Sequence, residues 1–291
     1  MRIGVLTDHR LVAVAGDGSA VEIGQLLETP ATRPGLDGVT DRLAALADRL
    51  EAVRDYLGQP DAPRMPVAGL RFLAPSPRPA TVLAAPVNYR AHAGELGDRS
   101  PERGALDARA LGLIVLAPAS VTGPAGEIAL PDLPGREFHF EGEVAVVIGR
   151  EARGVSPAEA LSHVLGYTGL IDVTLRLSEE GREERSMRKS YHTFTPLGPY
   201  LLTADEVPDP AALSLELARN GEVRQRGSLA DLIVDVAGLV SRASAMLPLR
   251  PGDVIATGTP AGVGPIEPGD TLALRVSGVG ELVMPVVRRD W

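Results

Sequence analysis

The chain has 291 residues, with 29 Lys and Arg against 38 Asp and Glu, and therefore a formal net charge of −9. It contains no cysteine, which excludes disulfides, thiolate catalysis and cysteine-held zinc or iron–sulfur sites. The acidic balance and the lack of a basic stripe argue against nucleic acid as a partner. No apolar run reaches about 18 residues and no signal segment is evident, so we expect a cytoplasmic protein that does not engage a membrane.

The first 70 residues predict a small α+β domain. Residues 1–30 show short strand-like runs separated by glycine-containing turns. An amphipathic helix is then predicted from apolar residues at helical spacing: Val39, Leu43, Leu46, Leu50, Val53 and Leu57. The Pro-rich segment 62–80 follows it and is typical of a linker. We therefore predict two domains, 1–70 and 71–291.

The second part of the chain is predicted to be mainly β. With 32 Gly and 25 Pro, and only 3% aromatic residues, the composition favours many tight turns and aliphatic packing. Apolar or alternating runs predict strands at 82–87, 143–149, 167–175 and 200–203. One helix is predicted to begin after Ser156, which opens a capping box, and a second helix is predicted over 229–247. Pro-Gly-Asp at 251–253 and 268–270 predicts two turns that lead into strands.

Three carboxylates stand out in otherwise apolar strands. Glu141 and Glu143 are two residues apart, so both side chains would lie on one face of a strand. Asp172 is the only charged residue of GYTGLIDVTL. The alternatives are a solvated Glu pair at a strand end and a structural ion pair between Asp172 and Arg176. If the three meet, they would form an all-oxygen site suited to Mg²⁺, Mn²⁺ or Ca²⁺ rather than zinc.

Two further segments could carry chemistry. In NYRAHAGE (88–95), His92 and Glu95 would be adjacent on a helix, where a carboxylate can orient a general-base imidazole; such pairs also occur on exposed helices without a function. The glycine-rich run 257–264 lacks the GxxxxGK[ST] spacing, which excludes a nucleotide P-loop. Its backbone amides could approach a carboxylate or enolate ligand, or it could be a structural turn.

Taken in order, five segments make the chain resemble the fumarylacetoacetate hydrolase family over 68–288: NYRAHAGE, EGE, GYTGLIDVTLR, KSYHTFTPLGP and GDVIATGTPAGVG. The resemblance implies a mixed β-roll or barrel in the C-terminal domain, a smaller N-terminal α+β domain and a homodimer. It also implies a divalent-metal-dependent hydrolase that cleaves a C–C bond in an acylpyruvate or related 1,3-dicarbonyl or 2-oxo acid.

The resemblance also implies a role for each matching residue. Glu141, Glu143 and Asp172 would bind the metal, with Mg²⁺ or Mn²⁺ the expected ion and Ca²⁺ an alternative. His92 and Glu95 would activate water, Lys189 would stabilise charge or bind substrate, and Arg176, Gly258 and Thr259 would contact the substrate.

The sequence departs from the family pattern at four positions, which hold Pro86, Leu116, Glu179 and His192. These departures put the substrate in question more than the metal. Two alternatives therefore stay open. One is an oxaloacetate-type decarboxylase, isomerase or dehydratase of 2-oxo acids on the same fold. The other is a family member that binds a metal or ligand without turnover.

Overall fold

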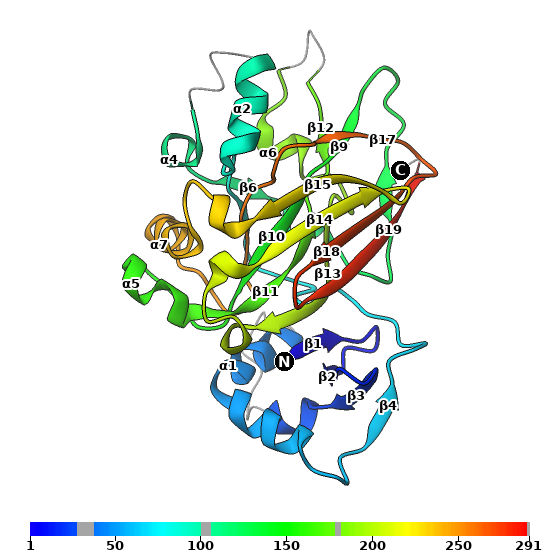
Figure 1. Cartoon of the computed structure of the whole chain (residues 1–291), viewed down its shortest axis with the longest axis vertical. Coiled ribbons are helices and arrows are strands. Elements are labelled where there is room, and N and C mark those ends of the chain that lie inside the picture. The colour runs from blue at the N-terminus through cyan, green and yellow to red at the C-terminus, as the bar shows by residue number, and fades with distance from the viewer. Residues whose placement is uncertain (28–37, 100–105, 178–181, 290–291) are drawn as a thin grey trace.

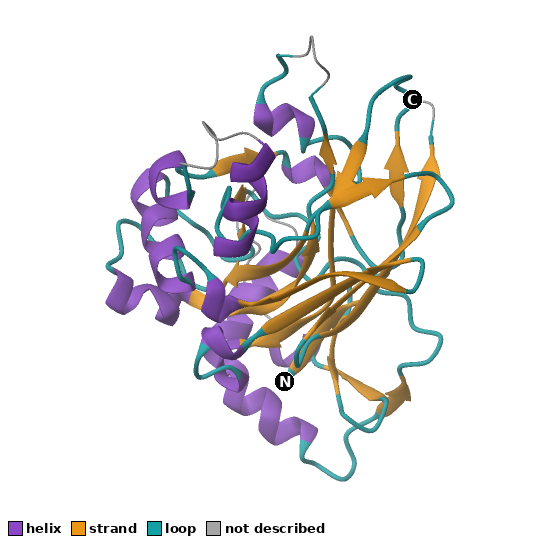
Figure 2. Cartoon of the chain, turned by 45° about the horizontal axis from the view of Figure 1, so that its top comes forward, coloured by secondary structure: helices purple, strands orange, loops and turns teal. Residues whose placement is uncertain are grey.

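The computed structural model describes residues 1–27, 38–99, 106–177 and 182–289, except for the side chains of 95–99. Within these residues the strands form three sheets, of eleven, five and three strands. Most of the helices gather on one side of the strands (Figure 2). The expected α+β, mainly β class is confirmed. None of the helices in the described ranges combines the length and the apolar character that a membrane span requires.

The largest sheet runs through both halves of the chain. Its strands follow the order β4-β3-β2-β1-β13-β11-β10-β16-β5-β6, and β7 pairs with β13. Their bounds are β1 (Arg2–Val5), β2 (Leu11–Val14), β3 (Ser19–Glu22), β4 (Arg64–Pro66), β5 (Val82–Ala84), β6 (Ile114–Leu116), β7 (Val121–Thr122), β10 (Gly142–Ile148), β11 (Val164–Ile171), β13 (Thr195–Thr203) and β16 (Val254–Ala256). Strands are confirmed at the predicted 82–87, 143–149 and 200–203, although β5 ends at Ala84, β10 runs from Gly142 to Ile148 and β13 begins earlier, at Thr195.

The five-stranded sheet packs against the centre of the largest one (Figure 1). It comprises, in spatial order, β15 (Glu222–Ser228), β14 (Ser214–Arg219), β18 (Thr271–Val276), β19 (Gly280–Arg288) and β8 (Ile128–Leu130). β14, β18 and β19 contact β10, β11 and β13 in turn, and Val144, Leu217 and Leu274 are buried in the shared core. The third sheet joins β12 (Thr174–Leu175), β9 (Phe138–Phe140) and β17 (Gly264–Ile266).

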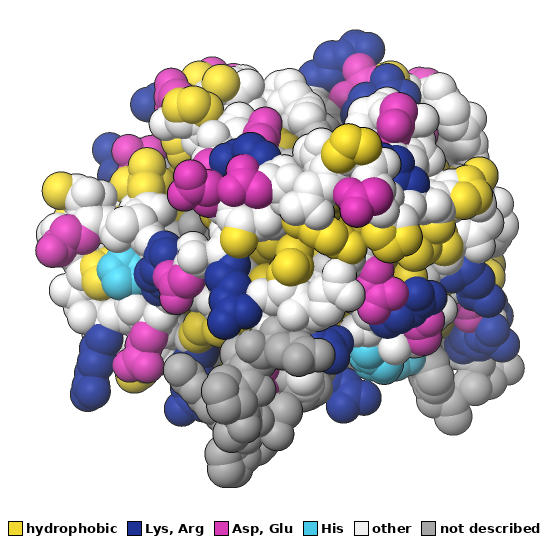
Figure 3. Space-filling view, turned by 90° about the horizontal axis from the view of Figure 1, so that it is seen from below, with side chains coloured by type: hydrophobic (Ala, Val, Ile, Leu, Met, Phe, Trp, Pro, Cys, Tyr) yellow, Lys and Arg dark blue, Asp and Glu magenta, His cyan; other side chains and the backbone are white. Residues whose placement is uncertain are grey.

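The described residues also include six α-helices and six 3₁₀ turns. They are α1 (Gly38–Leu57), α2 (Arg90–Arg99), α4 (Ala108–Leu111), α5 (Pro157–Ala160), α6 (Arg185–Arg188) and α7 (Val236–Met246), with 3₁₀ turns at Gly24–Leu27, Pro118–Ser120, Leu161–His163, Ala204–Glu206, Pro210–Ala212 and Leu229–Asp231. The helix predicted over 39–57 is confirmed as α1, whose Leu43 and Leu46 pack on the N-terminal strands. Figure 3 shows basic and acidic side chains interspersed on the face seen from below.

Two predicted elements differ from the structure. The helix predicted over 229–247 begins only at Val236, because Asp235 caps it by accepting from the amide of Gly238 at 2.7 Å. The strand predicted over 167–175 is broken after Ile171, where the chain leaves the main sheet, and its continuation β12 pairs with β9. Asp172 lies in that break and is thereby placed beside Glu141, which directly precedes β10.

The N-terminal strands continue the main sheet rather than forming one of their own. β1 pairs antiparallel with β13, with Arg2 opposite Leu202. Val147, Leu165 and Leu201 of the central strands share a hydrophobic cluster with the N-terminal residues. Figure 1 shows β1 to β4 and α1 below the rest of the molecule. The division into domains at residue 70 stays a prediction.

Candidate active site

Three acidic side chains meet where β10 and β11 lie side by side. The two strands are antiparallel, with Glu143 opposite Leu170, so Glu141 at the start of β10 lies beside Asp172 after the end of β11. The amide of Asp172 donates to the carbonyl oxygen of Glu141 at 2.8 Å. One carboxylate oxygen from each of Glu141, Glu143 and Asp172 lies within 4.8 Å of the other two.

All three carboxylates are buried, with exposed fractions of 7% for Glu141, 2% for Glu143 and 1% for Asp172. The alternative of a solvated Glu pair at a strand end is therefore wrong. Like charges so close together raise the free energy of the folded state unless a proton or a cation neutralises them.

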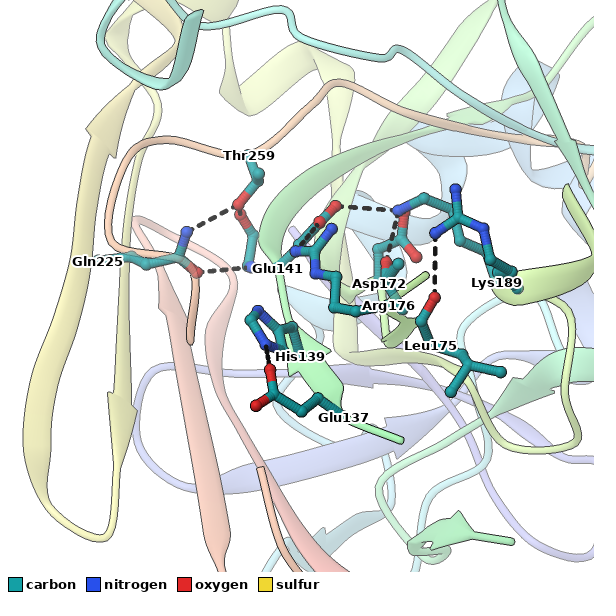
Figure 4. Close-up of polar contacts among 12 residues, drawn as sticks. Glu137, His139, Glu141, Asp172, Leu175, Arg176, Lys189, Gln225 and Thr259 are labelled. Atoms are coloured by element: carbon teal, nitrogen blue, oxygen red, sulfur yellow. Dashed lines mark hydrogen bonds and ion pairs between the residues drawn. The ribbon is translucent and has the colours of Figure 1, made fainter. Parts of the chain in front are cut away.

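Lys189 supplies one such cation, and it is the only lysine in the sequence. It follows α6 directly and is itself buried. Its Nζ donates to Asp172 Oδ2 at 2.6 Å, to Glu141 Oε2 at 2.9 Å and to Thr174 Oγ1 at 2.7 Å (Figure 4). An ammonium has three N–H donors. All three are used here, so Lys189 fixes two of the three carboxylates.

Arg176 is the second basic residue of the cluster. Its guanidinium donates to Glu141 Oε1 at 2.7 Å, and its side chain is 31% exposed. The alternative that Arg176 forms a structural ion pair with Asp172 is wrong. Asp172 pairs with Lys189, and Arg176 pairs with Glu141. Glu141 is thus bound on both oxygens.

The pKa values show how the charges are shared. Burial would raise the pKa of Glu141, but the charges of Lys189 and Arg176 outweigh it and hold the pKa below its ordinary value. Burial and the charge of Asp172 raise the pKa of Glu143 well above its ordinary value. Burial also raises the pKa of Asp172, to about 6, although Lys189 opposes the shift. Burial would lower the pKa of Lys189, but Asp172 and Glu141 outweigh it and raise the pKa.

The cluster fits a hard divalent cation. Among the residues that the structure describes, Lys189 forms ion pairs with Glu141 and Asp172, and Arg176 forms one with Glu141. Within the same ranges, Asp172 Oδ1 is buried with no hydrogen-bond partner. Buried carboxylate oxygens with an unsatisfied acceptor are the ligands that Mg²⁺, Mn²⁺ and Ca²⁺ prefer. Glu141, Glu143 and Asp172 are therefore the residues that would hold such an ion.

The glycine-rich loop after β16 closes the site on one side. Gly258 has φ of +101°, and a Cβ there would lie 2.8 Å from Asn88 Cβ, so the position requires glycine. Its amide donates to Glu143 Oε2 at 2.6 Å. Thr259 Oγ1 donates to the carbonyl of Gly142 at 2.9 Å. The loop thus holds a carboxylate of this chain, while substrate contact by Gly258 and Thr259 stays a prediction.

Comparison with known proteins places this site in a family. Residues 81–287 match the family model described as fumarylacetoacetate (FAA) hydrolase C-terminal. The chain belongs to the fumarylacetoacetate hydrolase family. It is 38% identical to a maleylpyruvate hydrolase of Aquipseudomonas alcaligenes, over 98% of this chain and 99% of that protein. The predicted family and its fold are confirmed.

Two of the similar solved structures cover 99% of this chain. One is a maleylpyruvate hydrolase from Sphingobium sp. SYK-6 in complex with manganese(II) ion and pyruvate, with a TM-score of 0.83, 35% identity and 99% of each chain covered. The other is a 5-carboxymethyl-2-hydroxymuconate delta-isomerase from Mycobacterium smegmatis, with a TM-score of 0.74, 33% identity, and 99% of this chain and 100% of that chain covered.

The predicted general-base pair of the family lies on α2 (Arg90–Arg99). His92 is buried, with 8% of its surface exposed, and it contributes to lowering the pKa of Glu141, after the larger effects of burial, Lys189 and Arg176. His92 is therefore close enough to Glu141 for an electrostatic interaction. The side chain of Glu95 lies outside the described residues, so the pairing of His92 with Glu95 stays a prediction.

The departures from the family pattern fall into different surroundings. Leu116, at a position where many family members have lysine, is fully buried in β6 and packs in an apolar cluster with Val82 and Ala84. Pro86 follows β5. His192 lies in the turn before Thr193. Glu179 falls outside the described residues.

Sequence reasoning missed two buried amides that hold the site together. Asn88 Nδ2 donates to the carbonyls of Thr257 at 2.8 Å and Val234 at 2.9 Å, which ties the loop to the start of α2. Gln225 contacts the loop and β10. Strand alternation gave no signal for the buried position of Gln225, because the register of the β14–β15 pair shifts between Val223 and Gln225.

Proposed function

We propose that the protein is a Mg²⁺- or Mn²⁺-dependent hydrolase that cleaves a C–C bond in an acylpyruvate, with maleylpyruvate the first substrate to test. The observation that carries the proposal is the convergence of three buried carboxylates on one point beside Lys189. The similarity to a maleylpyruvate hydrolase solved with manganese(II) and pyruvate, over the full length of both chains, supports the choice of ion and substrate.

The carboxylates and Lys189 prepare the site for an anionic substrate. A divalent ion held by Glu141, Glu143 and Asp172 supplies a Lewis acid that polarises the oxygens of a 2-oxo acid. Lys189 and Arg176 keep positive charge next to these ligands and so favour the negative charge that develops on the pyruvate half. Gly258 holds Glu143 in place through its amide.

His92 then acts as the general base. Oriented by Glu95, it takes a proton from water, and the hydroxide oxygen forms a bond to the acyl carbonyl carbon. The C–C bond between the acyl carbon and the pyruvate methylene breaks, and its electron pair leaves with the pyruvate half as an enolate. Protonation of that carbon by the histidinium gives pyruvate and a carboxylic acid. One water is consumed, so atoms and charge balance.

An isomerase of 2-oxo acids is the second candidate, favoured by the full-length similarity to a delta-isomerase. Isomerisation and decarboxylation pass through the same kind of enolate and need no attacking water. The residues around the carboxylates are compatible with either reaction, so the reaction type must be measured. A cytoplasmic homodimer completes the proposal.

The test is a pyruvate-release assay on the metal-free protein, reconstituted separately with Mg²⁺ and Mn²⁺. Acylpyruvates including maleylpyruvate, oxaloacetate and 2-oxo-enoic acids serve as substrates. We expect metal-dependent pyruvate release from an acylpyruvate, loss of that activity in Glu143→Gln, and retention in Glu216→Ala, which changes an exposed pair on β14. Turnover that survives chelator or Glu143→Gln would refute the metal role. No turnover and no thermal stabilisation by either ion would favour a non-catalytic protein.

A further inference from the structure

We propose that Gln225 is a positioning residue of the metal site: it holds the peptide between Glu141 and Glu143, and the loop that carries Gly258, in one fixed arrangement. The inference rests on the metal site of the proposed function. It adds a residue from the five-stranded sheet, on β15, which contributes none of the carboxylates.

Gln225 forms three hydrogen bonds in a fully buried position, with 1% of its surface exposed. Its Oε1 accepts from the amide of Gly142 at 2.8 Å. Its Nε2 donates to Thr259 Oγ1 at 2.8 Å and to the carbonyl of Pro260 at 2.8 Å. Figure 4 shows Gln225 and Thr259 on one side of Glu141 and Lys189 on the other. One side chain thus ties β15 to β10 and to the loop.

These partners leave the amide only one orientation. The Gly142 amide can only donate, and the Pro260 carbonyl can only accept. The oxygen of Gln225 must therefore face Gly142 and its nitrogen must face Pro260. Thr259 completes the ring of bonds, since its hydroxyl accepts from Gln225 and donates to the carbonyl of Gly142. A glutamate would lack the donors, and an apolar side chain would remove the bonds of Gln225 to the Gly142 amide, the Pro260 carbonyl and the Thr259 hydroxyl, of which only the hydroxyl keeps a second bond, to the Gly142 carbonyl.

The backbone that Gln225 and Thr259 hold is the segment that carries Glu141 and Glu143, two of the proposed metal ligands. Gly142 lies between Glu141 and Glu143, and both its N–H and its C=O are held, by Gln225 and Thr259 respectively. A Cβ at Gly142 would lie 2.9 Å from Leu217 Cδ1, so the absence of a side chain lets the two sheets approach here. The backbone amide of Gly258, next to Thr259, fixes Glu143 in turn.

A side chain that only stabilises the fold would change the unfolding temperature and leave the affinity for the ion unchanged. A positioning residue changes the affinity itself, because misplaced carboxylates bind more weakly. Replacement of groups that hold metal ligands typically lowers metal affinity or activity about 10- to 100-fold. The two roles therefore give different results on folded protein.

The experiment compares Gln225→Met, which keeps the side-chain length but has no hydrogen-bonding group, with wild type and with Arg226→Met. Arg226 is the next residue on β15, is 71% exposed and pairs with Glu216, so it is the matched control. Binding of Mn²⁺ to the metal-free proteins is followed by the EPR signal of free Mn²⁺. The Mn²⁺ concentration for half-maximal pyruvate release is measured in parallel, with circular dichroism to confirm folding.

We expect Gln225→Met to weaken Mn²⁺ binding at least about tenfold and to recover turnover in part at saturating Mn²⁺, while Arg226→Met matches wild type. Thr259→Val should shift the affinity in the same direction, and it carries the test if Gln225→Met does not fold. The double variant should lose little more than Gln225→Met, because both changes break one network.

Unchanged Mn²⁺ affinity in folded Gln225→Met, or in Thr259→Val where only that variant folds, would overturn the inference. So would additive losses in the double variant. A wild-type protein that binds Mn²⁺ but releases no pyruvate from any substrate refutes the proposed reaction alone, and the Mn²⁺ titrations still decide the role of Gln225. A wild-type protein that binds no Mn²⁺ overturns both.

Discussion

Replacement of Lys189 by methionine tests the charge balance of the site most directly. Methionine has a similar length, so the packing of the buried stem is kept while the ammonium is removed. The change leaves Glu141 and Asp172 without the cation that now bonds to both, and Thr174 without its donor. The ion pair of Arg176 with Glu141 remains.

The expected cost follows from that loss. Removal of one partner from a buried ion pair typically destabilises a protein by about 3–5 kcal/mol. For a chain of this size each kcal/mol lowers the melting temperature by roughly 2–4 °C, so metal-free Lys189→Met should unfold about 10 °C below wild type. The remaining carboxylates attract a divalent ion more strongly without the competing ammonium. We therefore expect Mn²⁺ to bind the variant more tightly and to restore most of the lost stability. The free energy of unfolding of the wild type should rise by about 2.7 kcal/mol when the Mn²⁺ concentration is 100 times the dissociation constant.

The assay is thermal unfolding followed by circular dichroism, with chelator and then with excess Mn²⁺, together with calorimetric titration of Mn²⁺. Arg150→Met is the control, because it removes an exposed ion pair with Asp48 and should change stability by at most about 1 kcal/mol. The reasoning is refuted if Lys189→Met in chelator unfolds at the wild-type temperature, or if Mn²⁺ stabilises it no more than wild type. Turnover should fall despite tight metal binding, because the proposed mechanism uses the charge of Lys189 to stabilise the negative charge that develops on the pyruvate half.

Three further predictions concern other parts of the site. His92→Ala should reduce acylpyruvate hydrolysis by at least about 100-fold with unchanged Mn²⁺ affinity, as measured by pyruvate release and titration; retained hydrolysis would exclude His92 as the base. Because the pKa of Asp172 is raised to about 6, the native metal-free protein holds a proton there more tightly than the unfolded chain, so its stability falls as pH rises through about 6. The ion must displace this proton, so Mn²⁺ affinity should drop about tenfold per pH unit below 6; pH-independent calorimetric affinity between pH 5 and 7 would contradict this. Gly258→Ala should destabilise the protein by about 1–3 kcal/mol and weaken Mn²⁺ binding, because a Cβ meets Asn88 at 2.8 Å; a wild-type urea midpoint would argue against strain there.

The elements that local pattern determines were predictable from the sequence. α1 follows from apolar residues at helical spacing, and β10 from a run of small and branched apolar residues. The start of α7 was not predictable in this way. The apolar residues from Leu229 onward fit helical periodicity, but Leu232 forms a β-bridge with Tyr89 and the helix begins only at Val236. The Asp235 cap decides the boundary, and a capping hydrogen bond competes with a helical pattern only in the folded geometry.

The candidate ligands were predictable by residue type and order, but their surroundings were not. Two-residue spacing placed Glu141 and Glu143 on one face, yet the spacing does not say what covers that face. Gly142 and Val144, on the opposite face of β10, pack on the five-stranded sheet, whereas Ala145, on the same face as Glu143, packs with residues of β5 and β6. Likewise, sequence separation favoured Arg176 as the partner of Asp172, while the break after β11 turns Asp172 toward Lys189 instead. Pairing of charges is set by tertiary contacts, which one sequence does not display.

The residues that fit the local pattern least well are those that form the site. A carboxylate that interrupts an apolar strand, a glycine at positive φ and an amide buried in an otherwise charged hairpin each raise the free energy of their own segment. At Asp172, Gly258 and Gln225 these local costs fall within one set of hydrogen bonds around Glu141 and Glu143. Residues that are locally unfavourable are expected to concentrate at functional sites. A bound cation would neutralise the repulsion among the three carboxylates and so stabilise this arrangement.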